Sequence, residues 1–238
     1  ANPSYFAYLK LGDGCDNWCT YCAIPSIRGR FRSRPMEDIV AEAKELAAGG
    51  VKELNLIAQD ISRYGEDLYG QPMLPQLLTQ LCRIDGLVWL RLLYCYPDRI
   101  TDQLLEVMAQ EEKIVKYLDI PLQHANGRIL KKMNRFGSRE EITRLVNHIR
   151  AKVPGIALRT TLIAGFPGET SEEFTELCEM VQELKFERLG CFAYSPEEGT
   201  PASRMDGQLD EREKAHRADI VMTEQYSVAQ EVGSRQIG

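Results

Sequence analysis

Short apolar or β-branched runs alternate along the chain with longer amphipathic segments. This alternation predicts repeated βα units around a parallel sheet, because buried parallel strands are short and apolar and the helices that cover them are amphipathic. The expected strands span residues 5–12, 51–59, 89–95, 117–123, 157–165 and 188–195. The expected helices span residues 36–48, 73–83, 101–111, 126–151 (broken near Gly137), 171–185 and 210–231.

Six βα units are two short of the eight that close a TIM-type barrel. We therefore expect an α/β fold, a partial and open TIM-type barrel of six βα units, with its chemistry at the carboxyl ends of the strands. The chain has 238 residues, of which 44% are hydrophobic, and no linker or low-complexity tract interrupts the pattern. That is enough to bury one large core, so we expect residues 1–238 to form a single domain.

The charged residues comprise 29 basic and 35 acidic side chains, a net charge of −6. This balance offers no electrostatic footprint for tight nucleic-acid binding. No apolar run approaches membrane-spanning length, and the first residues lack the layout of a secretory signal. We expect a cytoplasmic protein without a membrane partner. The chain begins without methionine and ends in SRQIG, so we also expect it to be a piece of a longer protein.

Three of the seven cysteines, Cys15, Cys19 and Cys22, lie in the segment GDGCDNWCTYC directly after the first expected strand. Thiolates are the standard ligands of iron-sulfur clusters, and three of them leave one iron of a 4Fe-4S cluster without a protein ligand. That iron can chelate S-adenosylmethionine and pass an electron to its sulfonium. Structural zinc is disfavoured because it takes four ligands, and incidental burial because the loop is polar. The spacing predicts a 4Fe-4S site.

The other four cysteines lie far apart, on apolar stretches of expected helices and strands, at Cys82, Cys95, Cys178 and Cys191. Their spacing is not that of a disulfide framework. We interpret them as ordinary core cysteines rather than as a second cluster.

Polar residues or glycine follow the later strands. Gln59 and Asp60 end the second strand, Gln123 and His124 the fourth, and Gly165 the fifth. If the cofactor lies across the mouth of the barrel, residues at these carboxyl ends line it. We predict that Gln59, Asp60, Gln123 and Gly165 bind the cofactor, with Gly165 allowing close approach of the backbone. His124 is either an acid or base, or a hydrogen-bonded structural residue.

Arg159 and Thr161 alternate on the fifth expected strand and should face the same way, into the barrel. A buried arginine needs a partner. For Arg159 this is either the cofactor carboxylate or substrate, or a structural carboxylate such as Asp119. Four more arginines alternate in an expected extended segment, where they form either a basic edge or a solvated surface: Arg28, Arg30, Arg32 and Arg34.

Tyr21, directly before the third cysteine, completes the pattern C-x3-C-x-aromatic-C of the radical S-adenosylmethionine superfamily, which this chain resembles. The resemblance implies that Tyr21 packs near the adenine of the cofactor; a purely structural tyrosine is the alternative. Nearly the whole chain resembles the methylthiotransferases of that superfamily. The segments that carry this are GCDNWCTYCAIPSIRG, LIAQD, RILKKMNR, LIAGFPGET and AYSPEEGTPA.

Within that family, AQDISRYG, YCYPDRIT, YLDIPLQHAN and YSPEEGTPA resemble the branch that modifies a ribosomal protein. The resemblance implies transfer of a methylthio group to the β-carbon of an aspartate in small-subunit ribosomal protein twelve. The alternatives are methylthiolation of an adenosine in transfer RNA by the sister branch, another radical reaction, or a non-catalytic redox or scaffolding module.

The resemblance also implies components outside this chain. These are a second 4Fe-4S cluster in an amino-terminal domain, a carboxyl-terminal β domain, and an electron donor such as flavodoxin or ferredoxin. We expect no catalytic dyad beyond the cluster ligands, because the cofactor supplies the difficult chemistry while the protein binds and aims it.

Overall fold

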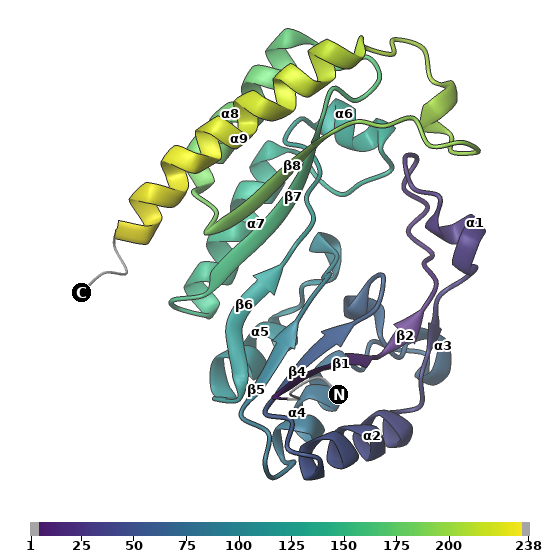
Figure 1. The fold of residues 1–238 in the computed structure, drawn as a ribbon, viewed down its shortest axis with the longest axis vertical. Helices are drawn as coiled ribbons and strands as arrows, with labels where there is room; N and C mark the ends of the chain where they lie inside the picture. Colours follow the sequence, from purple (N-terminus) through teal and green to yellow (C-terminus); the bar gives the residue numbers. More distant parts are fainter. Residues whose placement is uncertain (1–4, 235–238) are drawn as a thin grey trace. The chain divides into compact units, whose positions relative to one another are not determined.

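The computed structural model describes residues 5–234, and the four residues at each end lie outside the described part (Figure 1). The described chain divides into two compact units. Unit 1 comprises residues 5–16, 24–119 and 149–156, and unit 2 comprises residues 17–23, 120–148 and 157–234. The expectation of a single domain over residues 1–238 stays a prediction, because a domain is defined by independent folding and a unit only by its contacts.

Unit 1 holds four parallel strands in chain order. They are β1 (Phe6–Lys10), β4 (Glu53–Ile57), β5 (Trp89–Leu92) and β6 (Ile114–Asp119). Their core positions include leucines without solvent exposure, among them Leu9, Leu56 and Leu118. Leu9 pairs with Leu56 in register, so apolar side chains are aligned from strand to strand.

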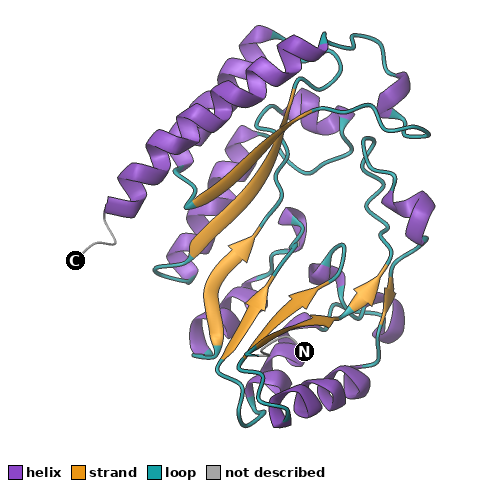
Figure 2. Cartoon of the chain, viewed as in Figure 1, coloured by secondary structure: helices purple, strands orange, loops and turns teal. Residues whose placement is uncertain are grey.

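The helices of unit 1 follow its strands (Figure 2). They are α1 (Ile24–Arg28), α2 (Met36–Ala48), α3 (Glu66–Tyr69), α4 (Leu74–Cys82) and α5 (Asp102–Gln110), with the 3-10 turns η1 (Ile61–Arg63) and η2 (Pro97–Arg99). A two-residue antiparallel ladder joins β2 (Gly12–Asp13) to β3 (Arg32–Ser33). The helix α2 has the predicted bounds. Pro35 is its N-cap and Gly49 is its C-cap, in line with the preference for proline at the start of a helix and glycine at its end.

Unit 2 contains the parallel pair β7 (Ala157–Ala164) and β8 (Arg188–Ala193). Its helices are α6 (Gly127–Lys132), α7 (Arg139–Lys152, whose last turn counts with unit 1), α8 (Ser171–Leu184) and α9 (Glu211–Ser234), with the 3-10 turn η3 (Ala202–Arg204). Thr170 caps α8 in a capping box with Glu173. That arrangement satisfies two backbone N–H groups that the first turn leaves unpaired.

The expected fold class is confirmed: the described chain is α/β, with six parallel strands and intervening helices, two short of a closed barrel. The expected helix 126–151 is broken into α6 and α7, with Gly137 at a φ of +97° between them. The strand β6 lies three residues earlier than predicted at its start, beside a register shift between Leu90 and Leu92. The expected extended arginine segment begins instead with α1, so Arg28 ends a helix.

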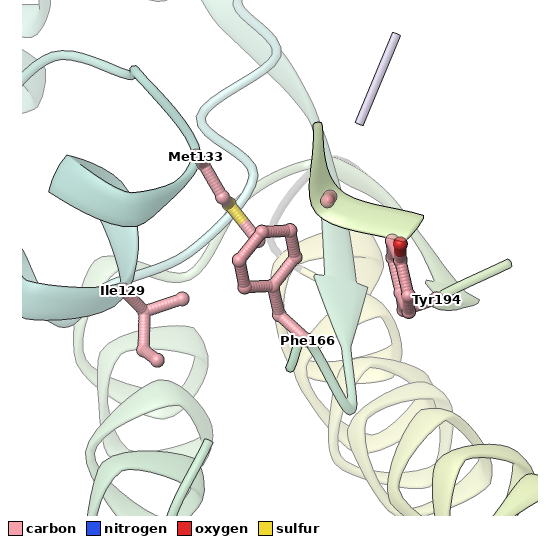
Figure 3. Packing of buried hydrophobic residues seen from close by; sticks show 5 residues of the cluster. Ile129, Met133, Phe166 and Tyr194 are labelled. Carbon is pink, nitrogen blue, oxygen red and sulfur yellow. The ribbon is translucent and has the colours of Figure 1, made fainter. Parts of the chain in front are cut away.

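A small apolar cluster in unit 2 joins α6, the end of β7 and the end of β8 (Figure 3). Phe166 lies between Met133 and Tyr194, with Ile129 beside it. The rings of Phe166 and Tyr194 meet edge to face with centroids 5.2 Å apart, a favourable geometry. Tyr21 packs against this cluster from the cysteine loop.

Within residues 5–234, no helix is both long enough and apolar enough to cross a membrane.

Candidate functional site

Cys15 lies in unit 1, where its backbone pairs with the segment that contains Gly29 and Arg30. Its N–H donates to the carbonyl oxygen of Gly29 over 3.1 Å. The preceding residue, Gly14, has a φ of +81°, and a Cβ there would lie 2.1 Å from the carbonyl oxygen of Arg30. Only glycine fits that position, which explains why the first cysteine follows one.

The segment with Cys19 and Cys22, residues 17–23, belongs to unit 2 and is held by Thr20. The Thr20 N–H donates to the Met133 carbonyl over 3.0 Å, and the Thr20 hydroxyl donates to the Lys132 carbonyl over 2.8 Å. The Thr20 carbonyl accepts from the N–H of Ala202 over 2.9 Å. These bonds attach the loop to the end of α6 and to η3.

Asn134 adds a second attachment. Its side-chain amide donates to the carbonyls of Asn17 and Trp18 over 3.0 and 3.1 Å. Trp18 and Asn134 both have positive φ, at 51° and 54°. Non-glycine residues adopt this region only where surrounding contacts maintain it. Cys22 is turned back by its N–H, which donates to the Cys19 carbonyl over 3.0 Å.

Arg135 reaches the cysteine itself. One of its Nη atoms lies 3.6 Å from Cys19 Sγ, and the other donates to the carbonyl of Pro121. The charged guanidinium of Arg135 therefore lies next to Cys19, a predicted cluster ligand. Spacing in the sequence did not indicate this contact; the segment RILKKMNR was marked only by family resemblance.

All seven cysteines within residues 5–234 are thiols and none is in a disulfide. Cys15, Cys19 and Cys22 are half-buried. In the part of the chain that the structure describes, no three side chains of Cys, His, Asp or Glu lie close enough together to bind one metal ion. The donor chemistry fits an iron-sulfur cluster: three partly accessible thiols, each on a loop whose backbone is fixed.

Of the other four cysteines, Cys82 and Cys95 are buried, and Cys178 and Cys191 are half-buried. Burial raises the pKa of Cys82 and Cys191 to about 12 and that of Cys178 to about 11. Burial also raises the pKa of Cys95 well above its usual value. Thiols of this kind are poor nucleophiles and poor metal ligands.

Gln59 and Asp60 follow β4 in unit 1, where they were predicted. Asp60 is 1% exposed and caps η1, accepting from the N–H of Ser62 over 3.0 Å and from the Ser62 hydroxyl. Arg99 lies 3.8 Å from its second oxygen. The Oε1 atom of Gln59 is buried and accepts no hydrogen bond from any described residue. A buried acceptor of this kind is rare and fits a ligand donor.

Gln123 has the corresponding position in unit 2. Its backbone extends the pairing with β7, since its N–H donates to Thr161 and its carbonyl accepts from Ile163. The residue has a φ of 77°, uncommon for a non-glycine residue, and its buried Oε1 has no hydrogen-bond partner among the described residues. Strain and an unsatisfied acceptor coincide at one predicted cofactor contact.

His124 takes part in a buried network. Its Nδ1 accepts from the N–H of Asn126 over 3.0 Å, so its Nε2 carries the proton and donates to Glu169 over 3.1 Å. Arg217 of α9 donates to the other oxygen of Glu169 over 2.7 Å. Both ring nitrogens of His124 are occupied and the side chain is fully buried, which supports the structural interpretation.

Gly165 ends β7 with a φ of +74°, and its N–H donates to the Glu169 carboxylate. A Cβ there would lie 2.5 Å from Cγ of Lys214 on α9. The close approach that requires glycine in this structure is therefore the approach of a helix. The contact of Gly165 with a cofactor stays a prediction.

Arg159 and Thr161 are both half-buried on β7 and alternate with buried neighbours, so they face the same way as expected.

The arginines after the cysteine loop are largely paired with acids. Nitrogen-to-oxygen distances are 3.6 Å for Arg28–Asp13, 3.5 Å for Arg30–Asp16 and 2.7 Å for Arg34–Glu42. The Arg30 side chain is 83% exposed, which favours the interpretation as a solvated surface.

Tyr21 is half-buried against the cluster of Figure 3, so it does fill space as the alternative interpretation held. Its contact with the adenine stays a prediction. Thr20, Asn134 and Arg135 were missed, because the residues that hold a loop in place carry no motif of their own.

Solved structures share this fold. The radical S-adenosylmethionine methyltransferase TsrM from Kitasatospora setae matches with a TM-score of 0.65 at 20% identity, over 83% of this chain and 38% of that one. Coproporphyrinogen III oxidase HemN from Escherichia coli matches with a TM-score of 0.63 at 18% identity, over 96% of this chain and 52% of that one. At these identities the likeness concerns the fold alone.

Curated relatives are much more similar. The proteins of Pelotomaculum thermopropionicum and Clostridioides difficile named ribosomal protein uS12 methylthiotransferase RimO are 56% and 50% identical over all 238 residues. The chain spans about half of their length, 54% in both. The family model described as the radical SAM superfamily matches residues 9–181, which include the three-cysteine loop. Since that match covers most of the chain, the protein belongs to the radical SAM superfamily.

Proposed function

We propose that this chain is the catalytic core of a methylthiotransferase that modifies the β-carbon of an aspartate in small-subunit ribosomal protein twelve, uS12. The observation that carries the proposal is the identity of 50% or more, over the whole chain, to relatives named ribosomal protein uS12 methylthiotransferase RimO; the aspartate β-carbon as target is what the family resemblance implies. Superfamily membership implies a 4Fe-4S cluster and S-adenosylmethionine. When bound, they supply a radical able to remove hydrogen from an unactivated carbon.

The residues of this chain bind the cluster and the cofactor and orient them. Cys15, Cys19 and Cys22 are the proposed cluster ligands, and three ligands leave one iron for the cofactor. The support is the partial accessibility of these thiols, together with the hydrogen bonds that Gly29 accepts and that Thr20 and Asn134 donate, which fix the surrounding backbone.

The proposed cofactor contacts are Tyr21, Gln59, Asp60, Gln123, Arg159 and Gly165. The best supported are Gln59 and Gln123, because each has a buried acceptor that a donor on the cofactor would satisfy. Asp60 also holds the turn after Gln59, because it accepts a hydrogen bond from Ser62 and lies 3.8 Å from Arg99. Arg159 suits a carboxylate, since guanidinium binds carboxylates in a bidentate manner.

Other components belong to the longer protein. We include in the proposal a second 4Fe-4S cluster outside this chain, a cytoplasmic location, and a one-electron donor such as flavodoxin or ferredoxin. The curated relatives are nearly twice as long as the chain, which leaves room for a further domain with the second cluster.

Mass spectrometry of uS12 and of transfer RNA, from cells lacking the full-length protein, tests the proposal. We expect uS12 to lose the mass of one methylthio group while transfer RNA is unchanged. Complementation with the wild-type protein should restore the mass, and complementation with Cys19→Ala should not. Loss from transfer RNA alone would move the function to the sister branch.

A further inference from the structure

The Arg135 side chain brings a positive charge to Cys19, one of the proposed cluster ligands. Arg135 follows α6 directly, and its N–H donates to the Leu130 carbonyl over 2.8 Å, which fixes its backbone. One Nη atom lies 3.6 Å from Cys19 Sγ while the other donates to Pro121. The guanidinium is therefore held at both ends, with one N–H group directed at the sulfur.

Other contacts hold the backbone of the cysteine loop. Thr20 bonds to the carbonyls of Met133 and Lys132, and Asn134 bonds to the carbonyls of Asn17 and Trp18. These bonds hold the backbone of residues 17–20. The Arg135 contact is made to a ligand atom instead, so its effect is separable from that of its neighbours.

A donor at a ligand sulfur acts on the electronic state of a cluster. Hydrogen bonds to the sulfurs and the charge around a cluster set its reduction potential. Adding an electron makes the cluster more negative, and a guanidinium that is permanently charged stabilises that state. Placed at Cys19, it raises the potential.

We propose that Arg135 is a positioning residue that raises the reduction potential of the cluster held by Cys15, Cys19 and Cys22. The inference rests on the proposed cluster site. The step it favours is the transfer of one electron from the external donor to the cluster, which goes from the 2+ to the 1+ state before the cofactor is cleaved. No bond forms or breaks at Arg135.

The experiment uses the full-length protein with its clusters reconstituted, as wild type and as Arg135→Gln and Arg135→Lys. Iron content and a redox titration followed by electron paramagnetic resonance are measured, with the signal of the cluster on these three cysteines identified by its loss in Cys19→Ala. We expect Arg135→Gln to keep its iron and to shift the midpoint potential to more negative values. Arg135→Lys, which keeps the charge, should shift it less.

Two matched controls separate charge from structure. Arg139→Gln removes one positive charge four residues away, where the arginine pairs with Glu179 and Glu183, and should leave the potential unchanged. Asn134→Ala removes the loop attachment without removing charge, and should lower iron retention without shifting the potential of the clusters that remain.

An unchanged potential in Arg135→Gln with full iron content overturns the proposal. If Arg135→Gln and Arg135→Lys both lose iron while their remaining clusters titrate as wild type, Arg135 is structural and the proposal is likewise overturned. The uS12 mass is measured in parallel. A shifted potential without uS12 modification refutes only the proposed function, and uS12 modification with an unshifted potential refutes only the role of Arg135.

Discussion

At the scale of single residues, Gly14 shows how closely the first cysteine is held. A methyl group there would lie 2.1 Å from the Arg30 carbonyl, at a backbone angle that costs an L-residue about 1–2 kcal/mol. We expect Gly14→Ala to lower both the melting temperature and the iron bound per chain after reconstitution, because the displaced backbone carries Cys15. Gly50→Ala is the control: its φ is +99° with no atom within 4 Å, so it should lower stability but not iron content.

Gln59 allows a test of the proposed cofactor contacts. Replacing Gln59 by leucine removes a buried acceptor that has no partner among the described residues. One hydrogen bond contributes about 0.5–1.5 kcal/mol, so the Kd for S-adenosylmethionine should rise about two- to thirteenfold in calorimetric titration. Gln76→Leu removes a similarly unsatisfied acceptor within α4 and should leave the Kd unchanged. Equal effects of the two variants would contradict the assignment.

Cys19 and Cys178 are a second matched pair. Cys19→Ala should abolish the visible absorption of the cluster on this loop and the cleavage of S-adenosylmethionine together, because two thiolates do not hold the cluster in place. Cys178→Ala removes a thiol whose pKa burial raises to about 11, and both readouts should persist. Cofactor cleavage that survives in Cys19→Ala would refute the ligand assignment.

At the scale of elements, Glu169 joins the end of β7 to α9 and to His124. Burial tends to raise the pKa of its carboxyl, but hydrogen bonds from His124 and Arg217 outweigh burial and hold that pKa below its usual range. Glu169→Gln leaves Arg217 short of a buried partner, which costs about 3–5 kcal/mol of unfolding free energy. Urea unfolding at pH 7 measures the loss.

The pH dependence of that difference has a definite sign. A carboxyl whose pKa is lower in the folded state stabilises the protein above its unfolded pKa of about 4.3, and this stabilisation is lost as the pH falls through the folded value. The gap between wild type and Glu169→Gln should therefore narrow in acid. Glu213→Gln, which removes the more exposed partner of Arg217, should cost at most about 1 kcal/mol. A larger loss there than at Glu169 would contradict the argument.

Elements with strong local signals were predicted within a few residues of their bounds. Pro35 and Gly49 bound α2, and Gly137 separates α6 from α7. The start of β6 was missed, because Ile114 and Val115 are separated from the next apolar residues by Lys116 and the register shifts beside them. Short turns such as η1 were not predicted, since three residues are too few to show periodicity.

At the scale of the whole molecule, the chain covers about half the length of its curated relatives, while the superfamily match lies inside it at residues 9–181. We expect the 238-residue chain, with its cluster reconstituted and a strong reductant, to cleave S-adenosylmethionine to 5′-deoxyadenosine. It should leave uS12 unmodified, because we place the second cluster outside it. Product chromatography and uS12 mass spectrometry measure both. Methylthiolation by the chain alone would contradict the proposal.

The sequence by itself determined the α/β class, the six βα units and the three cysteines after the first strand. Periodicity and motif spacing are local properties, and each can be interpreted within one segment. Only the tertiary structure decided that Arg135 meets Cys19, 116 residues away, and that Lys214 of α9 occupies the space beside Gly165. Such contacts arise where distant segments pack together, and packing is a property of the folded chain that no local pattern encodes.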